Sequence, residues 1–572
     1  MSIYRFSYWL RGDRPELSPD QRERHAIETA RNRIIITGAM FAVGFIWITA
    51  GLVDATVLRQ GNEPEMASGS DTRELKTERA NIVDRNGLLL ATDLPTNSLY
   101  ADARVIKDPV GSADLLLTAL PDLDRDTLIR HLSSQKAFVW LRRNLTPEKQ
   151  YAVNSLGIPG LNFQREERRV YPHGRLFAHV LGFTDIDNNG IAGVERKFDN
   201  ELRINNGPLQ LSVDTRVQYA LEEEVESAMK TYDAIGAAGM VMDIYTGEVL
   251  AMMSLPDFDP HRPGQAPSDA RFNRATLGVY EMGSVFKLFN TAIALETGIA
   301  HLDSMFDASQ PIRVGRFAIN DYRGENRWLS VAEIIKYSSN IGSARMALTF
   351  GTDVQQKFLK KFGLLDTPKI ELPEVGSPLV PKPWREVNTM TISFGHGIAV
   401  TPLQVVSGIS ALANGGILRP STILKQDGAP AGERIISRQT SDKIRRLMRL
   451  VVTDGSGKKA EVPGYYLGGK TGTSEKLVNG RYVKNARMST FVAAFPMQDP
   501  KYVVLVTLDE PKGTKETYGF ATAGWVSAPA VGKVVTRIAP ILGIEPANAK
   551  APEIEQALQI ELRKGERKLA SF

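Results

Sequence analysis

The sequence of 572 residues contains no cysteine, which excludes thiol catalysis, cysteine-ligated metals and disulfide bonds. None of its seven histidines belongs to a His-Glu-x-x-His pair, and no Gly-x-Ser-x-Gly elbow occurs. The patterns of zinc peptidases and α/β-hydrolases are therefore missing, and we expect neither a metal nor a cofactor. His396 stands in Phe-Gly-His-Gly, where we expect a loop near a cleft.

The chain also lacks a basic tract outside its N-terminal segment. Its 70 basic and 65 acidic residues are interspersed, with a net charge of +5 and a pI near 9.0. We therefore expect no nucleic-acid partner. The hydrophobic content of 42% is ordinary for globular proteins, and the length leaves room for more than one folded domain.

Residues 34–53 form a 20-residue stretch without a charge. As a helix this stretch spans about 30 Å, the thickness of one hydrocarbon core. Residues 1–33 hold seven arginines against five acids, which predicts a cytoplasmic tail. Because no cleavage site of the signal-peptide type is evident, we expect a retained anchor in the inner membrane, with the rest of the chain in the periplasm.

Three short motifs follow one another in the remaining sequence. They are Ser284-Val-Phe-Lys287, Ser338-Ser-Asn340 and Lys470-Thr-Gly-Thr473. The serine-x-x-lysine pattern alone is weak evidence for an active site, since it also begins at positions 133, 227 and 456. The match at Ser284 differs because it opens an apolar run, residues 285–295, that predicts a buried helix. The other two motifs occur once each, so chance is a poor explanation of the ordered set.

These residue types suit attack on an amide carbonyl. A serine hydroxyl needs a base, and Lys287 lies one helical turn after Ser284. Burial disfavours an ammonium, so the apolar run would lower the pKa of Lys287 and make it that base. The helix start also supplies free backbone N–H groups for an oxyanion. Ser338 and Asn340 end a predicted helix over 331–339, where they could relay a proton and hold the substrate amide.

Lys470, Thr471, Gly472 and Thr473 are predicted to lie on an edge strand, because two glycines before them permit close backbone approach. A cation and two hydroxyls there suit a substrate carboxylate. Residues 464–471 also match Gly-x-x-x-x-Gly-Lys-Thr, the phosphate-binding pattern. That alternative requires a preceding strand and a following helix, whereas Pro463 precedes the match and a polar stretch with Gly480 follows it.

Further segments carry a family resemblance. Residues 79–91 predict a hairpin around Asn86-Gly87, and residues 169–182 contain Arg-Val-Tyr-Pro-His-Gly and Ala-His-Val-Leu-Gly. Together with residues 190–202 and the three motifs, they resemble the class B penicillin-binding proteins from the anchor to about residue 545. Within that family the chain looks most like the division-type FtsI branch, which is similar to penicillin-binding protein 3. Ala80 replaces the usual glycine, and Met282 and Phe286 depart from the usual residues beside Ser284.

The resemblance implies an α/β fold with several parts. It places a single transmembrane helix at 34–53, an elongated α+β pedestal domain of the dimerisation type at 54–208, and a transpeptidase domain at 209–545. A tail, 546–572, follows. The transpeptidase domain is expected to hold an antiparallel sheet flanked by helices, with strands near 237–244, 248–254, 470, 491–496 and 503–508.

The resemblance also implies roles. Ser284 would be acylated by the penultimate D-alanine of a peptidoglycan stem peptide, and Lys287 would be its base. Ser338 would pass a proton to the leaving amine, Asn340 would hold the peptide, and Lys470 would tune the site. Thr471, Gly472 and Thr473 would bind the terminal carboxylate. Backbone N–H groups of Ser284 and Thr473 would form the oxyanion hole, and β-lactams would acylate the same serine.

The expected function is cross-linking of stem peptides during septal wall synthesis. Alternatives are an elongation-type transpeptidase, a D,D-carboxypeptidase or β-lactamase that passes the acyl group to water, and a non-catalytic scaffold of the division machinery. By resemblance, an FtsW-type polymerase would make the glycan strands and contact the anchor and pedestal, together with other membrane proteins of division.

Overall fold

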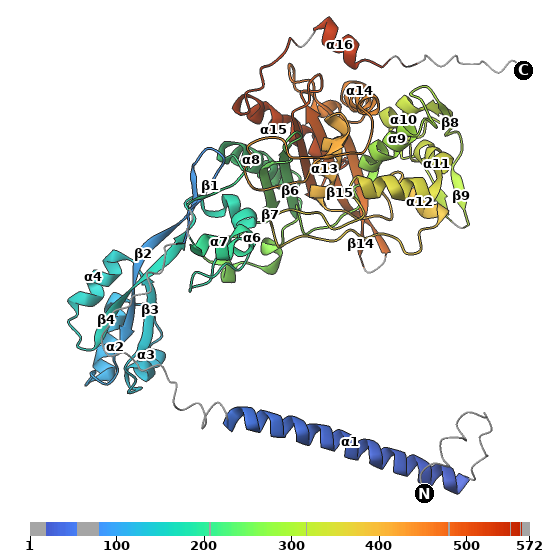
Figure 1. Ribbon diagram of the computed structural model, residues 1–572. Helices are drawn as coiled ribbons and strands as arrows, with labels where there is room; N and C mark the ends of the chain where they lie inside the picture. The colour runs from blue at the N-terminus through green and yellow to red at the C-terminus, as the bar shows by residue number, and fades with distance from the viewer. Residues whose placement is uncertain are drawn as a thin grey trace, which may run out of the picture. The chain divides into compact units, whose positions relative to one another are not determined.

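The computed structural model describes residues 19–53, 79–204, 207–315, 317–478, 481–548, 551–560 and 562. It contains two compact units, Met1–Lys76 and Thr77–Phe572. The described part of the first unit is one helix, α1 (Pro19–Val53; Figure 1). Residues 54–78, at the start of the expected pedestal domain, lie outside the described residues, as do the first 18 residues of the expected cytoplasmic tail and the last ten residues of the chain.

The anchor expected over residues 34–53 falls within α1. Among the described residues, no helix is long and apolar enough to cross a membrane. The side chains of residues 50–53 are not among those described. Large apolar side chains earlier in the stretch are exposed, from 58% at Ile36 to 81% at Trp47. The transmembrane helix is therefore not confirmed.

The second unit begins with the pedestal sheet. The expected hairpin at Asn86-Gly87 is confirmed, because β1 (Ile82–Val83) and β2 (Leu89–Ala101) pair antiparallel on either side of it. The strand order is β3-β2-β1-β5, and β4 pairs with the other side of β2. The remaining strands are β3 (Val139–Leu145), β4 (Leu161–Val170) and β5 (Leu209–Gln210).

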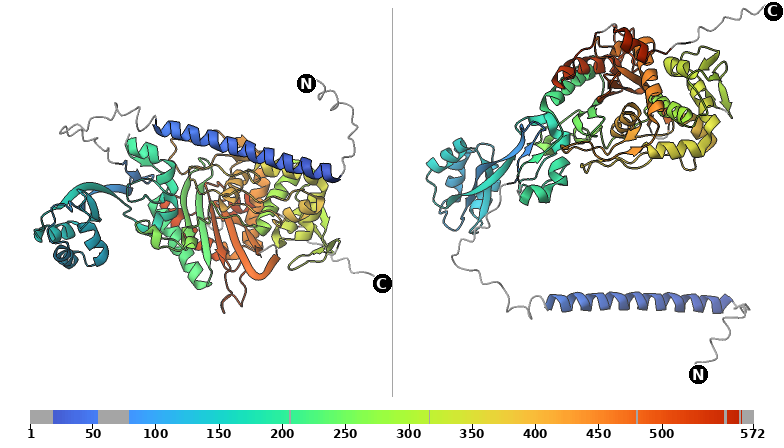
Figure 2. Two further views of the ribbon diagram at one scale, coloured as in Figure 1. Left: turned by 90° about the horizontal axis from the view of Figure 1, so that it is seen from below. Right: turned by 45° about the horizontal axis from the view of Figure 1, so that its top comes forward.

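Helices cover one face of the outer part of this sheet. Leu99 and Ala101 of β2 are fully buried, and they pack with Leu116 and Leu128 from two of these helices. Each of the three helices starts at a side-chain cap, Asp108, Asp124 or Thr146, which accepts a backbone N–H of the first turn. They are α2 (Pro109–Ala119), α3 (Arg125–Leu132) and α4 (Pro147–Ser155; Figure 2).

A buried ion-pair network joins the segments that carry the family resemblance. The carboxylate of Glu195, which is 0% exposed, binds Arg79 at 2.8 Å and Arg169 at 2.6 Å. Ala80, at the position of the usual glycine, donates its N–H to Leu202 O at 2.7 Å. The short elements around this network are η2 (Gly174–Phe177), α5 (Ala178–Leu181), α6 (Gly193–Lys197) and α7 (Asp199–Ile204).

The expected transpeptidase domain is built on a five-stranded antiparallel sheet of order β14-β15-β16-β6-β7. The strands predicted from the sequence are all present, and β14, which carries Lys470, lies at the edge as expected. Their bounds are β6 (Gly236–Asp243), β7 (Val249–Leu255), β14 (Gly468–Val478), β15 (Arg481–Phe495) and β16 (Tyr502–Asp509).

Alternate side chains of β16 serve two hydrophobic cores. Val503 and Leu505 join the core shared with helices of one face, while Val504 and Val506 join the core on the other. The first face is covered by α9 (Phe286–Glu296), α13 (Pro402–Ala413) and α14 (Arg438–Asp454), the second by α8 (Thr215–Thr231) and α15 (Ser527–Ile541; Figure 1). The predicted sheet flanked by helices is therefore confirmed.

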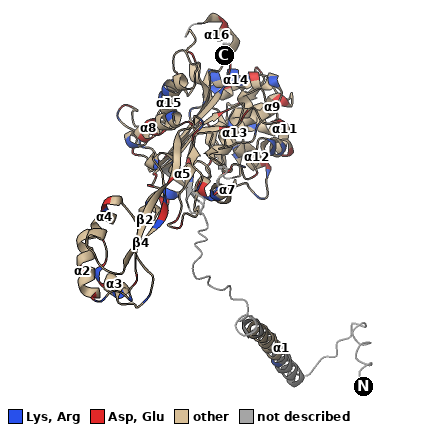
Figure 3. Cartoon of the chain, turned by 60° about the vertical axis from the view of Figure 1, so that its left-hand side comes forward, with Lys and Arg blue, Asp and Glu red and all other residues tan. Residues whose placement is uncertain are grey.

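The other elements of this domain surround α9 or connect the helices of the domain. The positions of basic and acidic residues are interspersed along the ribbon of the second unit (Figure 3). The helices are α10 (Val331–Tyr337), α11 (Asn340–Lys361), α12 (Glu386–Ile392) and α16 (Pro552–Leu558), with the short turns η3 (Pro263–Gln265), η4 (Ser268–Arg271), η5 (Gly283–Val285) and η6 (Lys458–Ala460). The short strands are β8 (Met305–Asp307), β9 (Ile312–Val314), β10 (Phe317–Ile319), β11 (Trp328–Ser330), β12 (Ile417–Leu418) and β13 (Glu433–Arg434).

Candidate active site

Ser284 lies where the turn η5 leads into the buried helix α9, as the sequence predicts. The preceding Gly283 has a φ of +52°, a conformation that favours glycine. A Cβ atom at Gly283 would lie 2.8 Å from the carbonyl oxygen of Thr473. The start of the helix thus lies directly against strand β14, and the nucleophile reaches the edge of the sheet.

Lys287 is fully buried, and its amine has four close neighbours. Nζ lies 2.8 Å from Ser284 Oγ, 2.6 Å from Ser338 O, 3.1 Å from Ser338 Oγ and 2.7 Å from Asn340 Oδ1. Ser338 O and Asn340 Oδ1 can only accept hydrogen bonds, so the amine donates to both of them. A neutral amine can donate two hydrogen bonds and accept one, so the Ser284 hydroxyl can donate to it. These contacts therefore allow the Lys287 amine to act as the base for the Ser284 hydroxyl.

The electrostatics of the site favour the neutral amine. Burial lowers the pKa of Lys287 well below its usual value, and the charge of Lys470 lowers it further. The carboxylate of Asp321 acts in the opposite direction. This agrees with the lowered pKa that the apolar run 285–295 predicts.

Ser338 lies between the two lysines. The predicted helix before it is α10, which begins with a capping box formed by Ser330 and Glu333. Ser338 ends that helix in the left-handed conformation, with φ of 58°. Its Oγ lies 3.1 Å from Lys287 Nζ and 3.0 Å from Lys470 Nζ. A hydroxyl that touches two amines can carry a proton between them.

Asp321 positions this second motif, and sequence analysis missed it. Its carboxylate accepts hydrogen bonds from Ser339 Oγ at 2.6 Å, from the N–H of Asn340 at 2.5 Å and from the N–H of Ile341 at 3.0 Å. These are the free donors at the start of α11, where a negative charge is favourable. Asp321 belongs to no motif and lies 18 residues before Ser339, so nothing local in the sequence marks it.

The third motif brings Lys470 and Thr471 to the same place. Lys470 is fully buried, and burial lowers its pKa to about 7. Thr471 Oγ1 lies 3.3 Å from Lys470 Nζ and 2.7 Å from Ser456 Oγ. Ser456 begins one of the three other serine-x-x-lysine matches, and the structure places its hydroxyl against the third motif. In the sequence, the two glycines that flank Ser456, Gly455 and Gly457, indicate a tight loop at this position.

Gly472 and Thr473 complete the contact between β14 and the nucleophile. A Cβ atom at Gly472 would lie 2.2 Å from the carbonyl oxygen of Met282, so only glycine permits this approach. Thr473 Oγ1 accepts a hydrogen bond from the N–H of Ala523 at 3.1 Å. The structure thus brings all predicted site residues together around Ser284.

A second set of contacts holds the loop that contains His396. The Glu281 carboxylate accepts hydrogen bonds from the N–H of Gly397 at 2.8 Å and from the Tyr482 hydroxyl at 2.9 Å, and it lies 3.1 Å from His396 Nδ1. The His396 and Tyr482 rings stack with centroids 4.4 Å apart. Glu281 and Tyr482 were missed because only the fold brings them together.

The unusual neighbours of Ser284 belong to the core. Met282 and Phe286 are each 1% exposed, and Phe286 packs on Phe289 with ring centroids 5.6 Å apart. Their side chains therefore support the helix and do not line the surface around the Ser284 hydroxyl.

Comparison with known proteins identifies the domains of the chain. Residues 237–532 match the family model of the penicillin-binding protein transpeptidase domain, and residues 74–233 match that of the penicillin-binding protein dimerisation domain. The chain is 40% identical to the probable peptidoglycan D,D-transpeptidase FtsI of Caulobacter vibrioides over 534 residues, covering 91% of this chain and 90% of that protein. It is 28% identical to the peptidoglycan D,D-transpeptidase FtsI of Escherichia coli, covering 92% and 95%.

A solved structure agrees at the level of the fold. The crystal structure of penicillin-binding protein 3 from Mycobacterium tuberculosis, complexed with aztreonam, superposes with a TM-score of 0.65. The two chains are 23% identical, and the match covers 82% of this chain and 98% of that one. The chain therefore belongs to the penicillin-binding transpeptidase family and, within it, to the class B, FtsI-type peptidoglycan D,D-transpeptidases.

Proposed function

We propose that Ser284 attacks the penultimate D-alanine carbonyl of a peptidoglycan stem peptide. The observation that carries this proposal is the buried Lys287 amine, 2.8 Å from Ser284 Oγ and with a lowered pKa. The serine proton passes to Lys287 as the Oγ–C bond forms. Backbone N–H groups of Ser284 and Thr473, which the close contact of η5 and β14 brings near each other, stabilise the oxyanion.

The leaving group is the terminal D-alanine. Ser338 passes a proton to its amine as the amide bond breaks, since its hydroxyl touches both lysines. Asn340 holds the peptide amide, and Lys470, Thr471, Gly472 and Thr473 bind the terminal carboxylate. An amine of a neighbouring stem peptide then attacks the acyl-enzyme, which forms the cross-link and frees the serine.

Labelling with a fluorescent penicillin tests the nucleophile. Wild-type protein should form a covalent adduct, and Ser284→Ala should form none. Ser227→Ala is the matched control, because Ser227 also begins a serine-x-x-lysine match but is exposed on α8. Labelling that persists in Ser284→Ala, or that disappears in the control alone, would contradict the assignment.

Product analysis tests the fate of the acyl group. Given a stem peptide and an acceptor amine, the enzyme should produce the cross-linked amide. Hydrolysis without cross-linking would instead indicate a carboxypeptidase. Transpeptidation and hydrolysis share the acyl-enzyme on Ser284. They differ in whether a bound acceptor amine or water attacks it.

We further propose a septal enzyme with its transpeptidase domain in the periplasm and its N-terminus in the cytoplasm. The charge-free stretch 34–53 and the arginines before it support an inner-membrane anchor. The names of the FtsI relatives support the septal role. A fluorescent fusion should gather at the septum, and membrane fractionation should recover the full chain with the membranes; an even peripheral signal would favour the elongation role.

The proposed partner is a glycan polymerase of the FtsW type, which contacts residues 34–53 and the pedestal. The proposed domain limits are 54–208 for the pedestal and 209–545 for the transpeptidase domain. Co-purification of the two proteins should decline when residues 34–53 are replaced. Unchanged co-purification after replacement of both regions would contradict the partnership.

A further inference from the structure

Two loops that hold the active-site motifs meet in a group of aromatic rings and cations. Arg323 Cζ lies over the ring of Phe520, 5.7 Å from its centroid. Phe520 stacks on Trp525, with centroids 5.6 Å apart and an interplanar angle of 19°. Lys459 Nζ lies over the Trp525 ring, 4.2 Å from its centroid. These four side chains are called the cation–aromatic cluster below.

Arg323 belongs to the loop that fixes the start of α11. Two residues before it, Asp321 accepts hydrogen bonds from Ser339 Oγ and from the N–H of Asn340. The carbonyl of Asn320 accepts a further hydrogen bond from Asn340 Nδ2 at 3.0 Å. A shift of this loop therefore shifts the end of the second motif.

The two rings of the cluster lie on the loop before α15, which is bound to the third motif. In this loop the N–H of Ala523 donates a hydrogen bond to Thr473 Oγ1 at 3.1 Å. The carbonyl of Ala521 accepts a hydrogen bond from Ser489 Oγ on β15 at 2.7 Å. The position of the rings is therefore tied to the edge of the sheet, where the third motif lies.

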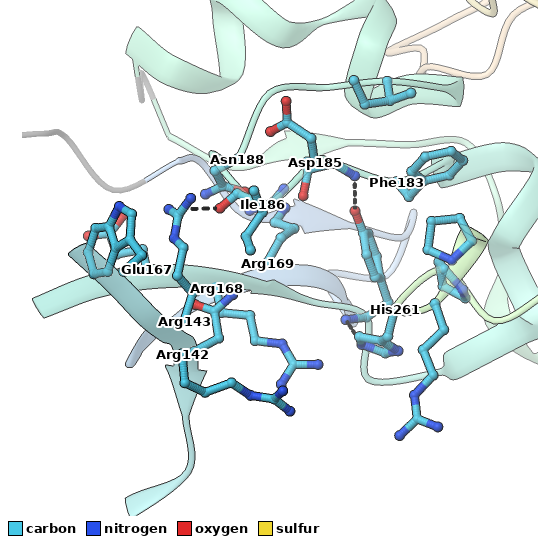
Figure 4. A pocket seen from close by; sticks show the side chains of 18 of the residues that line it. Arg142, Arg143, Glu167, Arg168, Arg169, Phe183, Asp185, Ile186, Asn188 and His261 are labelled. Atoms are coloured by element: carbon cyan, nitrogen blue, oxygen red, sulfur yellow. Dashed lines mark hydrogen bonds between the residues drawn. The ribbon is translucent and has the colours of Figure 1, made fainter. Parts of the chain in front are cut away.

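The cations of the cluster have ring faces as their partners. Within the described chain, neither of them forms an ion pair, although both side chains are exposed. Two arginines of the hollow in Figure 4 differ in this respect, because Arg143 binds Glu166 and Arg169 binds Glu195, each at 2.6 Å. A cation over a ring face is attracted by the negative charge of that face.

The carboxylates nearest to the cluster in the sequence do not compete with the rings, because other groups bind them. Their partners are Ser339 for Asp321, Arg327 for Glu325, Lys458 for Asp454 and Arg449 for Glu461.

The second and third motifs have few other connections. Among the described residues, one hydrogen bond joins them directly, from Lys470 Nζ to Ser338 Oγ at 3.0 Å. Before Ser338, the ion pair of Lys336 and Asp454 ties α10 to the loop that also contains Ser456. After Ser338, the contact of the Arg323 loop with the rings makes the corresponding link to the sheet edge.

We infer that Arg323 and Phe520 are positioning residues for the acylation of Ser284. Their contact keeps the second and third motifs at the separation that the hydrogen bond between Ser338 and Lys470 needs. Such bonds weaken steeply beyond about 3.2 Å, so a displacement of about 1 Å would interrupt the proton path that runs through the Ser338 hydroxyl. Neither side chain has to touch the substrate. This inference rests on the proposed function of Ser284.

Acylation of the full chain in detergent by a fluorescent penicillin tests the inference. Rates at several penicillin concentrations separate the limiting acylation rate constant from the dissociation constant of the non-covalent complex. Arg323→Gln keeps a long polar side chain but removes the cation. It should lower the limiting rate constant about twofold to fivefold, the factor that one exposed cation–π contact can supply. The dissociation constant should remain that of wild type.

Two further variants test the contact itself. Arg323→Lys keeps a cation and should retain most of the wild-type rate constant. Phe520→Leu removes the ring and should lower the rate constant at least as much as Arg323→Gln does. In the double variant, the loss should be smaller than the product of the two single losses, since both changes break the same contact.

Arg313→Gln is the matched control. Arg313 is exposed on β9, and it forms no ion pair in the part of the chain that the structure describes. The variant removes the same charge from the same region of the domain, so it should be acylated as wild type is. Thermal unfolding of each variant shows that the chain is folded.

Three results would overturn the inference. An unchanged limiting rate constant in Arg323→Gln would show that the contact does not position the motifs. A change in the dissociation constant alone would show that Arg323 binds the ligand. Equal losses in Arg323→Lys and Arg323→Gln would show that the cation over the ring is not the cause. All three leave Ser284 labelled, whereas failure of the proposed function appears as labelling that persists in Ser284→Ala.

Discussion

Replacement of Asp321 by asparagine tests whether the second motif is held by a charge. The aspartate accepts three hydrogen bonds, from Ser339, Asn340 and Ile341, at the start of α11. Asparagine keeps the size and one acceptor oxygen but removes the charge. The two N–H groups then donate to a neutral amide oxygen, and the amide NH2 replaces the oxygen that accepts from Ser339. Loss of the charge lowers the contribution of each bond by about 1 kcal/mol. Because Asp321 is only half-buried, we expect a total loss of about 1–2 kcal/mol of stability.

The same change should alter catalysis in a way that a purely structural role would not. Asp321 raises the pKa of Lys287, so removing its charge lowers that pKa. Lys287 must be neutral to accept the serine proton, and its neutral fraction falls as the pH drops through its pKa. The acid limb of the acylation rate should therefore move to lower pH. We expect this shift to be smaller than for a carboxylate in direct contact with the amine.

The assay is the rate of acylation by a fluorescent penicillin across pH, together with thermal unfolding. Without the Asp321 charge, the Asn340 side chain should also be displaced. This should lower the acylation rate at the plateau of the pH profile by about tenfold to a hundredfold, since small displacements are costly in an active site. Asp427→Asn, in an exposed loop, is the control and should match wild type. An acid limb that stays in place or moves to higher pH would refute the electrostatic role of Asp321.

Three further predictions concern other contacts. The buried Lys470 has a pKa of about 7, so the acylation rate of wild type should decline above neutral pH as its charge is lost; a flat profile from pH 7 to 9 would contradict this. Gly283→Ala should reduce penicillin labelling strongly, because the new Cβ meets the Thr473 carbonyl at 2.8 Å, and labelling at the wild-type rate would show that the contact yields easily. Arg169→Met should lower the free energy of unfolding by about 3–5 kcal/mol, because it leaves the buried Glu195 carboxylate with one partner fewer. An unchanged midpoint of thermal unfolding, measured by calorimetry, would count against a structural role for this network.

The local sequence determined the elements that carry the reaction. The apolar run after Ser284 predicted the buried helix, and the apolar run 503–508 predicted a strand, which the structure buries on both faces. These signals are local because burial of a helix or strand repeats with a fixed period along the chain. Family resemblance then joined the three motifs into one site, and the structure agrees.

The sequence did not determine what surrounds those motifs. Asp321 and Glu281 each act on a partner far along the chain, and no short pattern distinguishes them from other polar loop residues. The low pKa of Lys470 was equally hidden, since burial to 0% exposure is a property of the packed domain. Tertiary structure decided these features, because hydrogen bonds, desolvation and charge act over a few ångströms in space and take no account of distance along the chain.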